Sequence, residues 1–166
     1  DANDLVVKNP FAFLLAVICD QGMKAERAWE APHKLLKALG HLERVAELRP
    51  EAAAPRFALG VALARLGRNE EAEAAYLAAL ARDPGHLDSR QNLANLRLRS
   101  GRAAEALADF GLLRSADPNR AGAWLGAAAA EVALGRERAA RATLEAALAQ
   151  LPGDAGLESA WCRVAS

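Results

Sequence analysis

Residues 66–84, LGRNEEAEAAYLAALARDP, return twice farther along the chain, each time 34 residues later (66, 100, 134). The second copy is SGRAAEALADFGLLRSADP at 100–118, and the third is LGRERAARATLEAALAQLP at 134–152. Extended outward, the copies define three gap-free blocks at 53–86, 87–120 and 121–154. A fixed period of this length indicates a stack of small supersecondary units, because one unit alone cannot bury its apolar face.

Four kinds of residue recur in register in every block, and each has a physical task. A glycine takes the left-handed conformation that ends the first helix, and a small alanine lets the second helix approach closely. A bulky residue fills the gap to the neighbouring hairpin, and a proline stops the second helix. In block order these residues are Gly67, Gly101 and Gly135; Ala72, Ala106 and Ala140; Tyr76, Phe110 and Leu144; and Pro84, Pro118 and Pro152.

These marks resemble the tetratricopeptide repeat, a helix–turn–helix motif of 34 residues with Leu-Gly, Tyr, Gly, Ala, Phe and Pro at fixed offsets. The resemblance covers residues 53–154 and implies an all-α fold, a short right-handed α-solenoid of three helical hairpins. Ala127 and Glu131 depart from the family pattern, because large apolar residues are usual at their positions. This departure predicts looser packing in the third repeat.

The segments on either side of the repeats are expected to be helical. We predict two domains: an N-terminal helical segment at 1–50, then the three repeats with a C-terminal capping helix at 51–166. Beyond the last repeat, one helical stripe suits a cap over the final hairpin. Residues 33–50 look like the second helix of a degenerate repeat. The stripe consists of Leu157, Trp161 and Val164, and the degenerate repeat carries Ala38, Leu42, Val45 and Pro50 one period ahead of repeat residues.

The stretch NPFAFLLAVICDQG at 9–22 could be a secretion signal, a membrane anchor or a core helix. Its apolar run, 10–19, is too short for a bilayer, which takes about 20 residues. The preceding DANDLVVK is acidic, whereas a secretion signal opens with basic residues. We therefore expect a core helix in a cytoplasmic protein with no membrane partner. Its stripe of Phe11, Leu14, Leu15 and Ile18 is predicted to pack against a helix at 33–48.

Residues 9–45 also resemble the first core helix of helix–hairpin–helix, endonuclease III-like DNA glycosylases. The resemblance rests on Pro10-Phe11, the apolar run and Gln21, and it implies that Gln21 faces DNA. The family's glycine-rich hairpin, catalytic lysine and aspartate, and four-cysteine cluster have no counterparts here. All lysines fall within the first 37 residues, which suggests a join between two sequence origins. A nucleic-acid-binding remnant that uses Gln21 and Lys24 is therefore the alternative hypothesis, although nucleic acid is not the expected partner.

Composition argues against most other chemistry. The 21 basic and 21 acidic side chains balance, so no overall field attracts nucleic acid or membranes. Cys19 and Cys162 are too far apart for a disulfide framework, have apolar neighbours and are expected to be buried, inert thiols. The three histidines offer no ligand set, so neither a metal nor a cofactor is expected. The arginines after the turn glycines are expected to be solvated.

One turn contains the ingredients of a hydrolytic triad. His86, Asp88 and Ser89 follow one another closely between two helices, but no nucleophile elbow surrounds them. We interpret them as a polar turn in which Asp88 lies near a helix N-terminus and favours the helix dipole. No catalytic residue is predicted.

The tetratricopeptide resemblance implies that the first helix of each repeat lines a concave groove in which extended peptides bind. Side-chain amides suit this task because one amide both donates to and accepts from a peptide backbone. Arg65 and Arg99 would bias the groove toward acidic or C-terminal segments. The lining residues implied by register are Phe57, Val61, Arg65, Gln91, Asn92, Asn95, Arg99, Leu125, Ala129 and Val132.

The same register argues against one family ligand, the C-terminal tail of a chaperone. The clamp for such tails needs lysine and asparagine where this chain has Phe57 and Val61, and basic residues where it has Gly122 and Gly126. The predicted function is therefore a non-catalytic scaffold for a protein or peptide segment. A regulatory repeat region of a larger enzyme is a further alternative.

Overall fold

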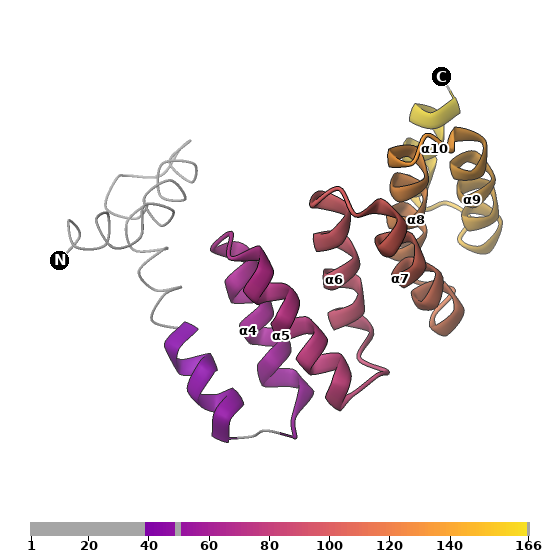
Figure 1. Cartoon of the computed structure of the whole chain (residues 1–166). Coiled ribbons are helices and arrows are strands. Elements are labelled where there is room, and N and C mark those ends of the chain that lie inside the picture. The colour runs from indigo at the N-terminus through magenta and orange to yellow at the C-terminus, as the bar shows by residue number, and fades with distance from the viewer. Residues whose placement is uncertain (1–38, 49–50, 166) are drawn as a thin grey trace, which may run out of the picture. The chain divides into compact units, whose positions relative to one another are not determined.

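The computed structural model describes residues 39–48 and 51–165, and every regular element within them is an α-helix (Figure 1). This confirms the predicted all-α fold. An unlabelled helix covers 39–48, and the four first helices begin one period apart (53, 87, 121 and 155). The labelled helices are α4 (Ala53–Arg65), α5 (Asn69–Arg82), α6 (Leu87–Arg99), α7 (Ala103–Ala116), α8 (Ala121–Ala133), α9 (Glu137–Gln150) and α10 (Ala155–Ala165).

The turn inside each hairpin depends on a glycine with a left-handed backbone. The φ angle is 73° at Gly67, 78° at Gly101 and 70° at Gly135, and glycine takes such angles without a Cβ clash. The arginine after each glycine donates its backbone N–H to a carbonyl five residues back, at 2.8 to 3.0 Å. This bond satisfies a carbonyl that the helix end would leave unpaired. The predicted stop signal of the first helix is confirmed.

The chain divides into two compact units, Asp1–Pro84 and Gly85–Ser166. In the first unit, α4 and α5 pack as one hairpin around Tyr76, which is 2% exposed. Gly60 of α4 lies directly under the Tyr76 ring, because a Cβ built on it would come within 2.6 Å of Tyr76 Cε1. The predicted small residue of this hairpin, Ala72, is fully buried. Close approach of the two helices therefore depends on glycine and alanine at the contact.

In the second unit, α6 to α10 form two layers. Each helix packs against the next along the chain, and α8 also contacts α6 and α10. The helices α6, α8 and α10 therefore form one layer, and α7 and α9 cover one side of it.

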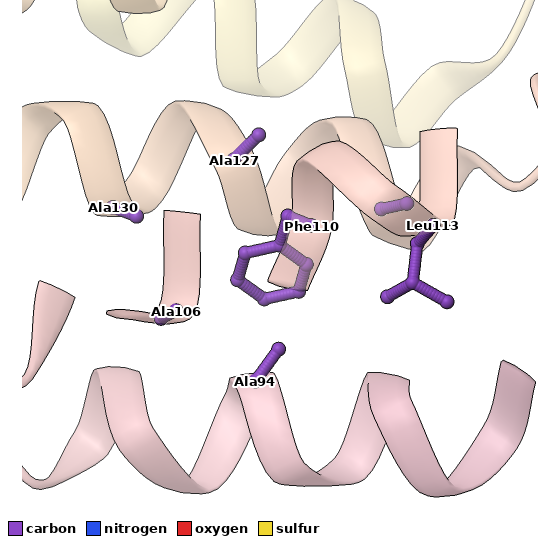
Figure 2. Packing of buried hydrophobic residues seen from close by; sticks show 7 residues of the cluster. Ala94, Ala106, Phe110, Leu113, Ala127 and Ala130 are labelled. Carbon is purple, nitrogen blue, oxygen red and sulfur yellow. The ribbon is translucent and has the colours of Figure 1, made fainter. Parts of the chain in front are cut away.

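Phe110 of α7 is the centre of the second unit's core (Figure 2). Its ring is fully buried among Ala94 of α6 and Ala127 and Ala130 of α8. A Cβ at Gly126 would overlap the ring, so α8 approaches Phe110 with bare backbone at that point. At Ala127 the neighbouring phenylalanine fills the space that a larger side chain would take, whereas the predicted looser packing of the third repeat as a whole stays a prediction.

The last helix, α10, covers the final hairpin as predicted. Leu157 is fully buried with Leu144 and Ala147 of α9, and Trp161 and Val164 pack around them. Asp154 caps the helix by accepting the Leu157 backbone N–H at 2.9 Å. The expectation of a buried thiol is wrong for Cys162, which is exposed because it lies outside this apolar stripe.

The predictions for the beginning of the chain are only partly open to comparison. Residues 9–22, with the proposed packing of Phe11, Leu14, Leu15 and Ile18, lie outside the described residues, as do Cys19, Gln21 and Lys24. The helix at 39–48 falls within the predicted helix at 33–50, with Leu39 buried and Leu42 and Val45 half-buried. The proposed domain boundary at residue 50 stays a prediction.

Candidate functional site

The predicted groove residues of the first unit lie on α4. Phe57 is half-buried, and its ring centroid is 6.2 Å from that of Tyr76 on α5. Val61 is half-buried as well, whereas Arg65 at the end of α4 is exposed. Phe57 therefore contributes to the packing of its own hairpin, and Arg65 is the polar group of this set that faces solvent.

The four predicted residues of α6 form the polar part of the candidate site. Asn92 is half-buried, Asn95 and Arg99 are exposed, and no hydrogen bond or ion pair engages these three side chains within 39–48 and 51–165. Gln91 differs, because its Nε2 donates to the Gly122 carbonyl of α8 at 3.5 Å. Its Oε1 is buried and accepts no hydrogen bond from the described residues. The α6 side chains thus hold unused donors and acceptors.

The three predicted residues of α8 form the apolar part. Leu125 is half-buried against the core of the last hairpin, Ala129 is exposed, and Val132 is 43% exposed. The Gln91 side chain links α6 to the start of α8, and these two helices contact each other. We call these seven residues the α6–α8 face; they are Gln91, Asn92, Asn95, Arg99, Leu125, Ala129 and Val132.

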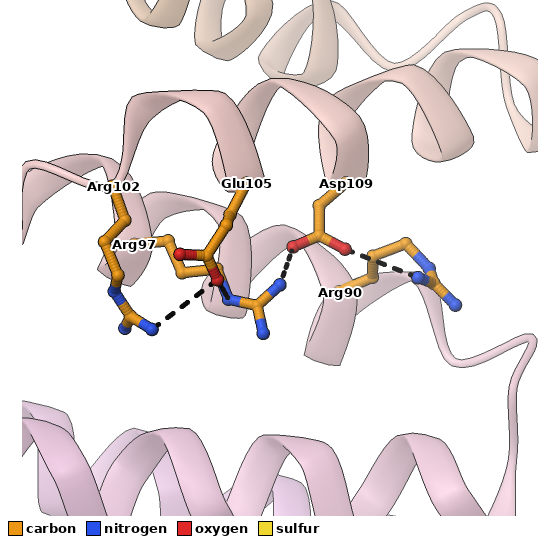
Figure 3. A network of polar contacts seen from close by, with 5 residues as sticks. All are labelled: Arg90, Arg97, Arg102, Glu105 and Asp109. Carbon is orange, nitrogen blue, oxygen red and sulfur yellow. Dashed lines mark hydrogen bonds and ion pairs between the residues drawn. The ribbon is translucent and has the colours of Figure 1, made fainter.

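Two other arginines of α6 belong to an internal network rather than to a surface (Figure 3). Asp109 of α7, 6% exposed, lies 2.7 Å from Arg97 Nη1 and 3.5 Å from Arg90 Nη1. Glu105 adds a contact of 3.6 Å to Arg97 and one of 3.7 Å to Arg102. The network joins α6 to α7, and it leaves Arg99 as the arginine of α6 without a carboxylate partner in the described structure.

The turn at His86 holds a serine and a histidine in contact. His86 Nδ1 is 2.9 Å from Ser89 Oγ and accepts the Ser89 backbone N–H at 3.2 Å, so it caps α6. Ser89 is fully buried, and no substrate can reach a buried hydroxyl. Asp88 accepts a 2.8 Å hydrogen bond from Arg120, which raises the pKa of Arg120. The contact between His86 and Ser89 therefore belongs to helix capping. Asp88 lies in the first turn of α6 as predicted, and its interaction with the helix dipole stays a prediction.

The arginines that follow the turn glycines are not alike. Arg68 donates twice to Glu71 at 2.6 Å, which raises the pKa of Arg68 and lowers that of Glu71. Arg102 pairs with Glu105. Both arginine side chains are 37% exposed, in agreement with the expectation of solvated turn arginines, and a glutamate three residues later adds an exposed ion pair to each. At Arg136 the corresponding residue is Ala139, and Arg136 is exposed.

Other kinds of site can be assessed only over the part of the chain that the structure describes. There, no group of three or more histidine, cysteine or acidic side chains is arranged to hold a metal ion. Nor does this part contain a helix with the length and apolar character needed to cross a membrane.

Known structures resemble this fold closely. MamA from Desulfovibrio magneticus RS-1 matches with a TM-score of 0.72 and 19% identity, covering 93% of this chain and 83% of that one. The first tetratricopeptide repeat domain of Spaghetti (RPAP3), bound to the HSP90 peptide SRMEEVD, matches with a TM-score of 0.62 and 21% identity, covering 68% of this chain and 90% of that one. The second tetratricopeptide repeat domain of human RPAP3, in complex with the HSP70 peptide SGPTIEEVD, matches with a TM-score of 0.59 and 21% identity, covering 64% of this chain and 89% of that one. At these identities the likeness concerns the fold alone.

Sequence comparison defines the family. No curated protein sequence matches this chain. Three family models, each described as a tetratricopeptide repeat, match residues 23–86, 75–108 and 97–160. None of the three describes a glycosylase, so that resemblance of residues 9–45 stays a hypothesis. Since the three matches overlap, describe one motif and together span 23–160, the chain belongs to the tetratricopeptide repeat proteins.

Proposed function

We propose that this chain is a non-catalytic scaffold that binds an extended peptide segment of a partner protein on the α6–α8 face. The proposal rests on the combination of unused hydrogen-bonding side chains and exposed apolar side chains on these two helices. Asn92, Asn95 and Arg99 offer hydrogen-bonding groups that no described residue uses. On α8, the helix that contacts α6, Ala129 and Val132 present exposed apolar surface. A peptide backbone can pair with the amides while its side chains cover the apolar surface.

Two of the similar structures bind peptides on the same fold, the HSP90 and HSP70 peptides named above. This supports a peptide as the class of ligand. The particular peptides are not expected here, because Gly122 and Gly126 stand where basic side chains would hold their terminal carboxylates. In the first unit, Phe57, Val61 and Arg65 of α4 hold the corresponding register positions, and Arg65 and Arg99 would each favour acidic segments.

The proposal can be tested without knowing the natural partner. A phage library of random dodecapeptides is selected on the intact chain, and the affinity of a selected peptide is measured by fluorescence anisotropy. Replacing Asn92 and Asn95 together by alanine should weaken binding about fivefold or more, at roughly 0.5–1.5 kcal/mol per lost hydrogen bond. The control is Gln150→Ala, an equal truncation of an exposed amide on α9. Both variants should keep the circular dichroism of the parent.

Unchanged affinity in the Asn92→Ala/Asn95→Ala variant would place the binding site elsewhere. A catalytic alternative is tested in parallel: we expect no cleavage of abasic or damaged duplex DNA and no hydrolase activity. Cleavage that is lost in Gln21→Ala, or tight duplex binding that falls steeply with salt, would instead support the nucleic-acid hypothesis.

A further inference from the structure

Besides covering the last hairpin, α10 repeats the position of a first helix. It begins at Ala155, 34 residues after α8 begins at Ala121, and it contacts α8 as α8 contacts α6. One period therefore separates Arg163 from Ala129, and Ala129 from Asn95 of the α6–α8 face. Ser159 stands in the same way one period after Leu125.

The side chains of α10 divide into two sets. Leu157, Trp161 and Val164 face the hairpin, whereas Ser159 and Arg163 are exposed. The first turn of α10 borders the α6–α8 face directly, because a Cβ on Gly156 would lie 3.7 Å from Leu125 Cδ1. Arg163 Nε donates to the Ser159 carbonyl at 3.3 Å, which aligns the side chain along the helix. Its remaining guanidinium N–H groups have no carboxylate partner in the described structure.

A second cation lies at the far end of α8. Arg136 follows the turn that ends α8, and unlike Arg68 and Arg102 it has an alanine where they have a glutamate. No described carboxylate pairs with Arg136. Asp88, the exposed acid of α6, is held by Arg120. Arg99 at the end of α6, Arg136 just past the end of α8 and Arg163 on α10 are thus three exposed cations without an ion pair to a described carboxylate.

We propose that α10 forms the third wall of the binding site, and that Arg136 and Arg163 join Arg99 in selecting an acidic extended segment with an aliphatic centre. The proposal rests on the proposed function. Neighbouring helices lie about 8–10 Å apart, so Arg99 and Arg163 are separated by roughly 16–20 Å across two spacings. An extended chain advances roughly 3.3 Å per residue. The two carboxylates of the ligand are therefore about five or six residues apart, with an aliphatic residue between them over Ala129 and Val132.

The probe is a fluorescein-labelled decapeptide of glycine and serine with two glutamates five residues apart and a central pair of leucines. Its counterpart carries glutamine in place of glutamate. The measured quantity is the ratio of the two affinities, which a purely structural change would not alter. For the parent chain, we expect the acidic peptide to bind more tightly, with a preference that declines as salt is raised.

The variant Arg136→Gln/Arg163→Gln should lower the preference for the acidic peptide by roughly threefold to tenfold, since exposed ion pairs contribute modestly. Arg138→Gln on α9 removes an exposed arginine outside this face and should leave the ratio unchanged. Circular dichroism checks that each variant is folded.

The proposal is overturned if the parent shows no preference for the acidic peptide, or if the double variant keeps the parent's ratio. Failure of the proposed function gives a different result. In that case the Asn92→Ala/Asn95→Ala variant binds its selected peptide as tightly as the parent. A third outcome separates the two proposals. If the Asn92→Ala/Asn95→Ala variant loses binding but Arg136→Gln/Arg163→Gln keeps the charge preference, the proposed peptide site stands and α10 is not part of it.

Discussion

Asp109 of α7 accepts a 2.7 Å hydrogen bond from Nη1 of Arg97 on α6, with only 9% of its side chain exposed. The two helices of this hairpin are thus joined by a nearly buried ion pair. Arg90, at 3.5 Å, supplies a second positive charge to the same carboxylate. Removing the carboxylate would take one hydrogen-bond acceptor from each of two partly buried guanidinium groups.

We therefore expect Asp109→Ala to lower the free energy of unfolding by about 1–3 kcal/mol, because two charge-assisted hydrogen bonds in a largely buried site are lost. Urea unfolding at neutral pH measures the change. The control is Glu105→Ala, which removes a half-exposed carboxylate from the same network and should cost less than about 1 kcal/mol. Replacing Arg97 and Asp109 together by methionine and leucine should recover part of the loss. Equal effects of the two single variants would show that burial of Asp109 contributes nothing.

A glycine-to-alanine series tests the core around Phe110. Gly126→Ala forces a methyl into the Phe110 ring, and overpacking of this kind costs about 1–3 kcal/mol. Gly111→Ala on α7 is the matched control, because nothing lies within 4 Å of its Cβ. There the same change should stabilise the protein by roughly 0.5–1 kcal/mol, since glycine is a poor helix former. Thermal unfolding of both variants gives the comparison, and a neutral Gly126→Ala would contradict the packing.

The two faces of α10 should respond differently to truncation. Leu157→Ala empties a fully buried position in the last hairpin and should lower stability by about 2–5 kcal/mol. Cys162→Ala changes an exposed position on the same helix, so its effect should stay within about 0.5 kcal/mol. Exposure itself is checked by adding a thiol reagent to the folded chain, where rapid modification of Cys162 is expected. A thiol that reacts only after unfolding would restore the original expectation of a buried cysteine.

The Arg68–Glu71 pair predicts a change in titration. Arg68 lowers the pKa of Glu71 below its ordinary value of 4.5, so the pair stabilises the fold where Glu71 is ionised. That contribution is lost as the pH falls through the lowered pKa. In Arg68→Gln the pKa of Glu71 should rise toward its ordinary value, as measured by carbon-detected NMR of the carboxyl groups. High salt should produce a similar but smaller rise in the parent chain, because the pair is exposed. A pKa of Glu71 that does not move would exclude the pair in solution.

Sequence predicted those features of the fold that depend on the chain's local geometry. The glycine turns, the buried alanines and the apolar stripe of α10 follow from period and residue size, and these predictions hold. Features that depend on which side chains meet in space were not predictable in this way. Asp109 lies on another helix than Arg90 and Arg97, so the spacing of residues along either helix does not indicate that the three side chains meet.

The candidate site shows the same division. Register alone placed Asn92, Asn95 and Arg99 on α6, and the structure finds their side chains unengaged. The position of α10 as a further first helix could nevertheless be predicted from the repeat period, because Ala155 stands one period after Ala121. The apolar stripe of α10 indicated a cap, but it carries no information about Ser159 and Arg163, which lie outside that stripe. Likewise, the alanine at position 139 distinguishes Arg136 from the two paired arginines before it.

The fit of Phe110 against Gly126 also limits how the repeats can be exchanged. Phe110 belongs to the second block and Gly126 to the third, so a ring from one block occupies volume left free by the next. Transplanting either block alone into another repeat protein would separate the ring from its recess and create a clash or a void. The smallest portable module that keeps this ring covered is therefore the run α6–α8, which crosses the boundary between two sequence repeats.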